Sequence, residues 1–190
     1  MTGTPPPRPG PHIGRSQQAA PQTPAREDDP RTKYRSTNGT GGTWFDAKEA
    51  PEFKHCPVAR EITQIMDALE ATDEDAHLEA KSQLKRFIRQ AREGTLTFDD
   101  PPAAGELPKY PDMLEIRVQV NPDHPDVSKR HLLRLYYAEP PEHEHVLLAL
   151  HFARKPRGQD RDGVQTRQIK TAQWRYTSGN RDGATWGLSL

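Results

Sequence analysis

The chain has 190 residues, enough for one ordinary domain, and its 27 basic and 27 acidic residues give a formal net charge of zero. This balance excludes a uniformly basic nucleic-acid binder but leaves room for a local basic patch. The single cysteine, Cys56, has no partner for an internal disulfide. That favours a cytoplasmic protein and argues against a cysteine-based metal site. No apolar run reaches the roughly 18 residues of a membrane span and no apolar segment follows the N-terminus, so we expect neither membrane association nor secretion.

Residues 1–42 are rich in proline and polar side chains, as in the stretches PPPRPGP and APQTPARED. After Met1, their only large apolar side chains are Ile13 and Tyr34. Such a segment buries too little surface to offset its ordering entropy, so we predict a disordered arm. A proline-rich ligand for a partner is the alternative, and an uncollapsed tail is the interpretation we favour. TNGTGG at 37–42 is typical of a flexible joint.

Two helices are predicted next, after a stretch at 43–47 (TWFDA) that could form a short edge strand. The first begins at Cys56-Pro57, and its apolar stripe comprises Val58, Ile62, Ile65, Met66 and Leu69. The second covers about 76–93 and ends at Gly94, and its stripe comprises Leu78, Leu84, Phe87, Ile88 and Ala91. The acidic link at 71–76 suits an N-cap better than a cation site. The short link predicts an antiparallel helical hairpin, and we expect a loop at 95–112.

The stretch from Met113 to Lys155 contains three apolar runs of strand length: MLEIRVQV, RHLLRLYY and HVLLALHFARK. They alternate with period two and their links are short, which predicts an antiparallel meander. In the third run we expect Val146, Leu148, Leu150 and Phe152 to oppose Leu147, Ala149 and His151. One face of the sheet carries Glu115, Arg117, Arg134, Tyr136 and His151, with Arg154 and Lys155 just past its end. Because these side chains are polar, we expect that face to lie outside the core.

The last part of the chain is basic. VQTRQIKTAQWRY from 164 predicts a short C-terminal helix, and we expect a flexible tail at 178–190. Residues 151–181 contain eight basic residues and two aspartates, so their local net charge is +6. The basic residues are Arg154, Lys155, Arg157, Arg161, Arg167, Lys170, Arg175 and Arg181. A patch beside a polar sheet face is the electrostatic pattern of a phosphate-backbone binder.

The sequence has no glycine-rich phosphate loop, no nucleophile elbow and no metal-ligand spacing, so we predict no cofactor and no metal. Metal-independent cleavage of RNA needs a base, an acid and cations for the phosphate. Arg117, Arg134, Arg154 and Lys155 could supply the cations; His151, Glu115 and Tyr136 or Tyr176 could transfer protons. Alternatively, Glu115 and Arg117 form ion pairs with Arg134 and His151 only packs. On residue types alone, we slightly favour this second interpretation.

The order of two helices, a three-stranded sheet, basic residues and a short helix resembles the RelE/ParE toxin superfamily, in particular its HigB-like, phage-derived branch. The resemblance spans about 56–176 and rests on four segments: GELPKYPDMLEIRV, HLLRLYYA, HVLLALHFARK and QIKTAQWR. It implies an α+β fold over 43–177, with an N-terminal helical hairpin packed on a small antiparallel sheet.

The resemblance also implies a function: a toxin of a type II toxin–antitoxin system that cleaves mRNA at the ribosome and is silenced by a cognate antitoxin. A DNA gyrase inhibitor or another non-catalytic nucleic-acid binder of the same fold is the alternative. Under the toxin hypothesis, the phosphate contacts Arg134, Arg154 and Lys155, and Arg117 orients it. Glu115 or His151 is the base, and Tyr136 or Tyr176 stacks on a base or assists proton transfer. Further RNA contacts are expected from Arg157, Arg167, Lys170 and Arg175.

Overall fold

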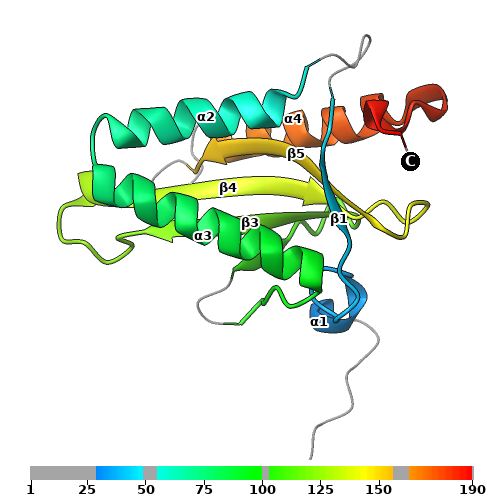
Figure 1. Cartoon of the computed structure of the whole chain (residues 1–190), viewed down its shortest axis with the longest axis horizontal. Helices are drawn as coiled ribbons and strands as arrows, with labels where there is room; N and C mark the ends of the chain where they lie inside the picture. The colour runs from blue at the N-terminus through cyan, green and yellow to red at the C-terminus, as the bar shows by residue number, and fades with distance from the viewer. Residues whose placement is uncertain (1–28, 49–54, 100–102, 156–162, 190) are drawn as a thin grey trace, which may run out of the picture.

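A computed structural model describes residues 29–48, 55–99, 103–155 and 163–189 of the chain (Figure 1). Within these residues, one five-stranded sheet has the strand order β1-β5-β4-β3-β2. The strands are β1 (Thr43–Asp46), β2 (Ala104–Glu106), β3 (Met113–Val120), β4 (His131–Ala138) and β5 (Val146–Arg154). The long helices are α2 (Pro57–Glu70), α3 (Glu74–Glu93) and α4 (Val164–Gly179), and a single turn, α1, covers Pro30–Lys33. The expected α+β class is confirmed.

The sheet is larger than the antiparallel meander that we predicted, and it is mixed. Strands β3, β4 and β5 form the expected antiparallel centre. Strand β1 pairs parallel with β5, which is possible because α2 and α3 lie in the connection that returns to the sheet. Strand β2 pairs antiparallel with β3 inside the stretch predicted as a loop. Its three residues, AGE, are too short and too small to produce an alternating pattern.

Helices α2 and α3 pack on one face of the sheet and build the larger core with it. Helix α3 begins at Glu74 because the Asp73 side chain accepts the N–H of Ala76, and it ends at Gly94, whose φ of 73° is left-handed. Leu78 was expected in the buried stripe but is 56% exposed. Alanines at 76 and 80 take the positions facing the core instead.

Part of the predicted arm lies against this layer. Residues 1–28 fall outside the described residues, but Tyr34 and Ser36 are buried. The segment 39–42 contacts the C-terminal end of α3, where the N–H groups of Gly39 and Gly42 donate to the carbonyls of Gly94 and Arg92 at 2.8 and 3.0 Å. The predicted joint therefore supplies hydrogen bonds to the last turn of α3.

The opposite face of the sheet lies beneath α4 (Figure 1). We expected this face to lie outside the core, and that is wrong for the part of the face that packs against α4 and the C-terminal segment. A second apolar cluster comprises Met113, Tyr136, Ala138, Leu148, Leu150, Ala172 and Trp186, among others. Trp186, from the segment predicted as a flexible tail, is fully buried and stacks on Tyr176.

A β-bulge in β5 changes which side chains share a face. Tyr136 pairs with His151 but Tyr137 pairs with Ala149, so Leu150 is the extra residue. Phe152 consequently lies on the α2–α3 side with Leu147 and Ala149, against our prediction of strict alternation. His151 still lies beside Tyr136, as predicted. No helix in the described part of the chain is long and apolar enough to cross a membrane.

Candidate nucleic-acid interface

Strands β3 and β4 bring together an acid–arginine cluster, defined by Glu115, Arg117 and Arg134. Arg117 and Arg134 are direct partners across the two strands. Both reach the same carboxylate oxygen: Glu115 Oε1 lies 2.8 Å from Arg117 Nε and 3.3 Å from Arg134 Nε. Gly105 in β2 leaves room for the Arg117 side chain because it has no Cβ. A Cβ at this position would lie 2.2 Å from Arg117 Nη2. The ion pairs among Glu115, Arg117 and Arg134, which the sequence suggested as the alternative to a catalytic role, are therefore present.

The cluster carries excess positive charge in a partly desolvated place. Glu115 and Arg134 are each only 4% exposed. Burial lowers the pKa of Arg134, and the nearby Glu115 opposes that shift. Lys155 adds a third cation: burial and then repulsion from Arg134 lower its pKa. Three cations around one carboxylate leave a net charge of +2, which favours the approach of an anion.

Two polar atoms of the cluster are buried and have no hydrogen-bond partner among the described residues: Glu115 Oε2 and Arg134 Nε. Such atoms cost free energy unless a ligand or water satisfies them. Arg134 Nε still lies 3.3 Å from Glu115 Oε1 and shares the ion pair, so Glu115 Oε2 is the atom of the cluster that is left without a donor.

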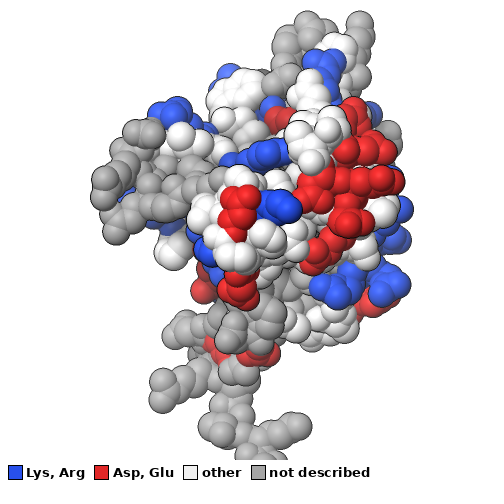
Figure 2. Space-filling view, turned by 90° about the vertical axis from the view of Figure 1, so that its left-hand side faces the viewer, with Lys and Arg blue, Asp and Glu red and all other residues white. Residues whose placement is uncertain are grey.

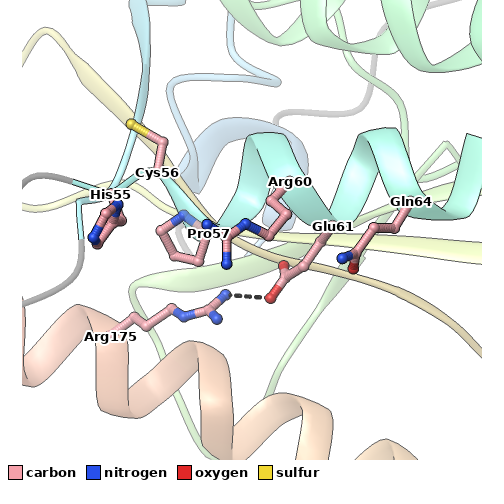
Figure 3. A pocket seen from close by; sticks show the side chains of 7 residues that line it. All are labelled: His55, Cys56, Pro57, Arg60, Glu61, Gln64 and Arg175. Carbon is pink, nitrogen blue, oxygen red and sulfur yellow. Dashed lines mark ion pairs between the residues drawn. The ribbon is translucent and has the colours of Figure 1, made fainter.

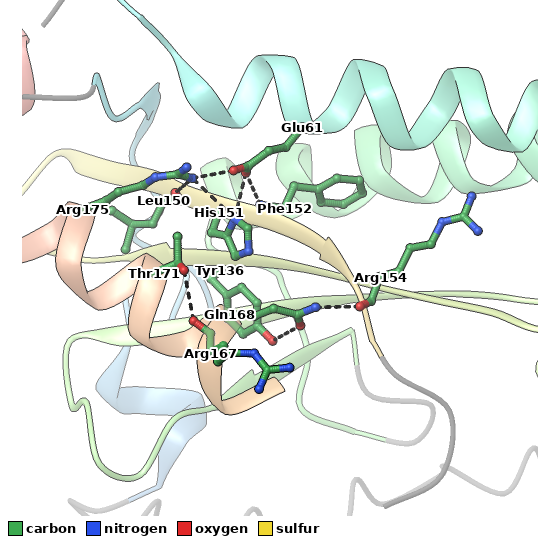
Figure 4. A network of polar contacts seen from close by, with 10 residues as sticks. All are labelled: Glu61, Tyr136, Leu150, His151, Phe152, Arg154, Arg167, Gln168, Thr171 and Arg175. Atoms are coloured by element: carbon green, nitrogen blue, oxygen red, sulfur yellow. Dashed lines mark hydrogen bonds and ion pairs between the residues drawn. The ribbon is translucent and has the colours of Figure 1, made fainter. Parts of the chain in front are cut away.

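A second group of polar residues, the β5-edge clasp, comprises Glu61, His151 and Arg175 (Figure 4). Glu61 comes from α2 and Arg175 from α4, and the two helices cover opposite faces of the sheet. Their side chains meet at the edge of β5, with Glu61 Oε1 2.8 Å from Arg175 Nη1. His151 Nδ1 lies 2.9 Å from Glu61 Oε2.

The clasp also satisfies the backbone of β5 where β1 has ended. The Phe152 N–H donates to Glu61 Oε2 at 2.9 Å, and Arg175 Nη1 donates to the Leu150 carbonyl at 2.8 Å. Burial alone would raise the pKa of Glu61. The hydrogen bonds from His151 and the Phe152 N–H outweigh it, so the net effect is a lowered pKa and an ionised carboxylate at neutral pH.

His151 connects the clasp to the polar face of the sheet. Its ring stacks on that of Tyr136, with centroids 6.0 Å apart and planes at 11°. The Tyr136 hydroxyl donates to Gln168 Oε1 at 3.4 Å, and Gln168 Nε2 donates to the Arg154 carbonyl at 2.8 Å (Figure 4). The start of α4 is thus fixed beside the end of β5.

The predicted site residues separate into groups. Glu115, Arg117, Arg134 and Lys155 come together, and Tyr136 and His151 are neighbours on the same face. Tyr176 lies apart: its ring stacks on Trp186 with centroids 5.6 Å apart, and burial raises its pKa.

The predicted RNA contacts also differ from one another. Arg154, Arg167 and Lys170 are exposed, as an RNA contact requires. Arg175, also predicted to contact RNA, is 9% exposed and belongs to the clasp, so it lacks the exposure of the other three. Arg157 lies outside the described residues. Sequence reasoning missed Glu61, although its position in α2 between the apolar Val58 and Ile62 is a recognisable signal for a carboxylate that faces the body.

Comparison with known proteins identifies no relative of this chain: no family model, no curated protein and no solved structure matches. In the described part of the chain, no three His, Cys, Asp or Glu side chains gather in a way that could hold a metal ion.

Proposed function

We propose that the chain binds RNA through the acid–arginine cluster and the adjoining basic residues, and that it cleaves mRNA as the toxin of a type II toxin–antitoxin pair. One observation carries the proposal. A net charge of +2 is held on Arg117, Arg134, Lys155 and Glu115, beside the exposed cation Arg154. Phosphates are the common anion that suits several arginines and lysines arranged along one surface.

The toxin assignment draws its support from the resemblance to the RelE/ParE superfamily, which supplies the substrate, mRNA at the ribosome, and an antitoxin as partner. The fold expected from that superfamily, a helical hairpin on the sheet, is part of the same proposal. The exposed cations Arg154, Arg167 and Lys170 would contact phosphates on either side of the one that reacts.

The reaction proposed is attack of a 2′-hydroxyl on the adjacent phosphorus, with release of the 5′-oxygen. A base takes the proton of the 2′-hydroxyl, and an acid gives a proton to the leaving 5′-oxygen. Arg117 and Lys155 stabilise the charge that develops on the phosphate oxygens. His151 is the best-placed proton-transfer group, because its side chain is 14% exposed and Glu61 holds its ring.

Burial favours a second candidate, a binder that does not cleave. Tyr136 is fully buried and Glu115 is 4% exposed, so two of the groups predicted to transfer protons are out of reach of a substrate in this conformation. In such a binder, Glu115 would only position Arg117 and Arg134. DNA gyrase or a nucleic acid would be its target.

The test is induced expression of the full chain in bacteria, with cellular mRNA 5′ ends mapped within minutes. We expect growth arrest and new 5′ ends clustered inside coding regions. The double variant Arg117→Ala/Lys155→Ala should neither bind RNA nor produce new mRNA 5′ ends. His151→Gln should still bind RNA but should produce no new 5′ ends. Arg89→Ala, an exposed position on α3, is the matched control and should behave as the parent.

Growth arrest with intact mRNA and damaged chromosomes would support gyrase inhibition instead. RNA binding by the purified chain without new 5′ ends in cells would support the non-catalytic binder. A double variant that is folded and still fully toxic would disprove the role of the cluster.

A further inference from the structure

We propose that a cavity between α4 and the link that joins β2 to β3 binds a guanine base. The cavity has a volume of about 240 Å³. Aromatic and polar side chains line it, namely Lys109, Tyr110, Asp112, Gln173 and Tyr176. No residue of the acid–arginine cluster or of the clasp is among its lining residues, so the cavity is separate from the place proposed for the reacting phosphate.

The wall that comes from the β2–β3 link is fixed by hydrogen bonds of its backbone. The Tyr110 N–H donates to the Leu107 carbonyl at 2.7 Å, and the Met113 N–H donates to the Tyr110 carbonyl at 2.9 Å. The Asp112 carbonyl accepts the Glu139 N–H at 2.9 Å. These bonds hold the turn without using the side chains of Tyr110 and Asp112, so a ligand would meet a wall that is already formed.

The opposite wall comes from α4, where Gln173 and Tyr176 are three residues apart and therefore neighbours on the helix surface. The Tyr176 ring stacks on Trp186 with planes at 10°, and Trp186 Nε1 donates to the Tyr176 carbonyl at 2.8 Å. Burial and then the negative charge of Asp112 raise the pKa of Tyr176. Its hydroxyl group consequently keeps its proton at neutral pH and can donate it in a hydrogen bond.

The polar side chains of this cavity have hydrogen-bonding capacity that the described part of the chain does not use. The Asp112 carboxylate forms no ion pair or hydrogen bond there, and neither the Tyr176 hydroxyl nor the Gln173 side-chain amide forms a hydrogen bond. The cavity at the start of α2 differs, because its Glu61 and Arg175 already pair with each other at 2.8 Å (Figure 3). A ligand with matching groups can therefore replace water at Asp112, Gln173 and Tyr176.

The chemistry of these groups indicates guanine. A carboxylate only accepts hydrogen bonds, and its two oxygens suit two donors that lie side by side. Among the Watson–Crick edges of the four RNA bases, only that of guanine has two adjacent donors, N1–H and the N2 amino group, beside an acceptor, O6. Asp112 would accept from the two donors, and Tyr176 or Lys109 would donate to O6. Tyr110 adds an aromatic ring of the kind on which unpaired bases stack.

The size and surroundings of the cavity also suit a single base. Its volume lies below the range of roughly 300 to 1,000 Å³ that is typical of sites for drug-sized ligands, so the ribose and phosphate of a nucleotide would remain outside. Lys170 is exposed and lies three residues before Gln173 on α4, where it can contact that phosphate. A free guanine nucleotide and an unpaired guanine in RNA present the same base.

The experiment titrates the full chain with the 5′-monophosphates of guanosine, inosine and adenosine, by calorimetry. We expect guanosine monophosphate to bind most tightly. Inosine monophosphate lacks the N2 amino group and should bind about tenfold more weakly, as the loss of one hydrogen bond to a charged group predicts. Adenosine monophosphate has an acceptor where guanine has N1–H, so it should show no saturable binding.

Two single-stranded RNA oligonucleotides then distinguish the sources of the base. They differ only in one position, which is guanine in the first and adenine in the second. Displacement of guanosine monophosphate by the first alone would assign the cavity to an unpaired guanine in RNA. Displacement by neither would assign it to free guanine nucleotides, and equal displacement by both would contradict recognition of the base.

Substitution of Asp112 tests the proposed contact directly. Asp112→Asn replaces one acceptor by a donor and leaves the backbone hydrogen bond to Glu139 in place, so Tm should not change. It should weaken binding of guanosine monophosphate about tenfold or more. Asp123→Asn, an exposed acid in the link between β3 and β4, is the matched control and should keep the parent affinity. Tyr176→Phe, which retains the ring beside Trp186, should weaken binding about fivefold, as the loss of one neutral hydrogen bond predicts.

The proposal is overturned if guanosine monophosphate shows no saturable binding, or if the three monophosphates bind equally. Unchanged affinity in Asp112→Asn, or an equal loss in Asp123→Asn, would overturn it as well. None of these measurements involves cleavage or the acid–arginine cluster, so failure here leaves the proposed function untouched.

Discussion

Glu61 shows how a single side chain can join two layers of this fold. Its carboxylate binds α4 through Arg175, β5 through the Phe152 N–H, and the polar face through His151. The bond from the Phe152 N–H replaces one that β1 would supply if it continued along β5, and Arg175, which Glu61 holds, satisfies the Leu150 carbonyl in the same way. The local result is an edge that is closed by side chains rather than by another strand.

We expect Glu61→Gln to destabilise the fold by about 2 kcal/mol, because it removes the charge that compensates a buried arginine. Chemical denaturation at pH 7 measures this loss. Asp67→Asn, an exposed acid on the same helix, is the control and should change the free energy of unfolding by less than about 0.5 kcal/mol.

The same substitution has a pH dependence with a definite sign. The folded-state pKa of Glu61 lies below its ordinary value of 4.5, so the unfolded chain binds the proton more readily. The stabilisation is therefore complete above pH 4.5 and disappears as the pH falls through the lower, folded-state value. The parent and Glu61→Gln should converge in stability on acidification, and a gap that widens would contradict the role assigned to Glu61.

Among the secondary-structure elements, those with strong local signals could be predicted and those that depend on pairing could not. Helices α2 and α3 have an apolar stripe, a proline or aspartate at the start, and for α3 a terminal glycine. Strands β3 and β4 alternate cleanly. Strand β2 has no pattern of its own, and the bulge at Leu150 arises from pairing with β4, which no local periodicity encodes.

The candidate site was predictable to the same extent. The alternation of apolar and polar residues along β3 and β4 predicts which side chains share a face. Glu115, Arg117 and Arg134 do lie on one face, as this alternation predicted. The helix partners of β5 were not predictable, because the contact of Glu61 with Arg175 joins positions 61 and 175, which only the tertiary fold brings together.

The C-terminal end of α3 gives a prediction for the segment at 39–42. A Cβ on Gly41 would lie 2.0 Å from the Arg92 carbonyl oxygen, and Gly41 has a φ of +67°. Gly41→Ala should cost about 3 kcal/mol, since backbone atoms cannot move aside and the left-handed conformation adds strain. Gly39 has a φ of +88° but open space around it, so Gly39→Ala should cost only about 1 kcal/mol. Equal costs in thermal denaturation would mean that 39–42 does not contact α3 in solution.

Two tryptophans of the C-terminal region form a matched pair. Trp186 is fully buried between α4 and the sheet, and Trp174, on α4, is 51% exposed. Trp186→Ala should destabilise the fold by about 4 kcal/mol through the cavity it leaves. Trp174→Ala should change stability by less than about 0.5 kcal/mol. Urea denaturation of both variants tests this, and a small effect of Trp186→Ala would show that residues after α4 are detached in solution.

At the scale of the whole molecule, the net charge is zero, but the acidic and basic side chains are not evenly distributed over the surface. Figure 2 shows acidic side chains gathered at one end, where α2 turns into α3 and the exposed acids include Glu70, Glu74 and Asp75. Exposed basic residues lie on β5 and α4, namely Arg154, Arg167 and Lys170, and also on α3, namely Lys81, Lys85, Arg86, Arg89 and Arg92. The acidic end repels an approaching polyanion, and the β5–α4 surface and α3 are the two basic surfaces that can attract it.

This distribution predicts how RNA binding responds to salt. Each phosphate contact that is lost should reduce the slope of log K against log salt by about 0.7 for a single strand. Arg154→Gln and Arg167→Gln should each reduce the slope by that amount, since both side chains are exposed on the basic surface. Arg175→Gln should leave the slope unchanged and lower the Tm, because Arg175 belongs to the clasp.

Filter binding of a short single-stranded RNA between 50 and 300 mM salt, roughly the range over which counterion release is resolved, measures these slopes. Arg89→Gln on α3 is the control, because it removes the same charge from the other face of the molecule. If Arg89→Gln reduces the slope as much as Arg154→Gln, binding follows total charge alone and the β5–α4 surface has no special role. A reduction confined to Arg154 and Arg167 would instead place the RNA backbone along the end of β5 and the start of α4.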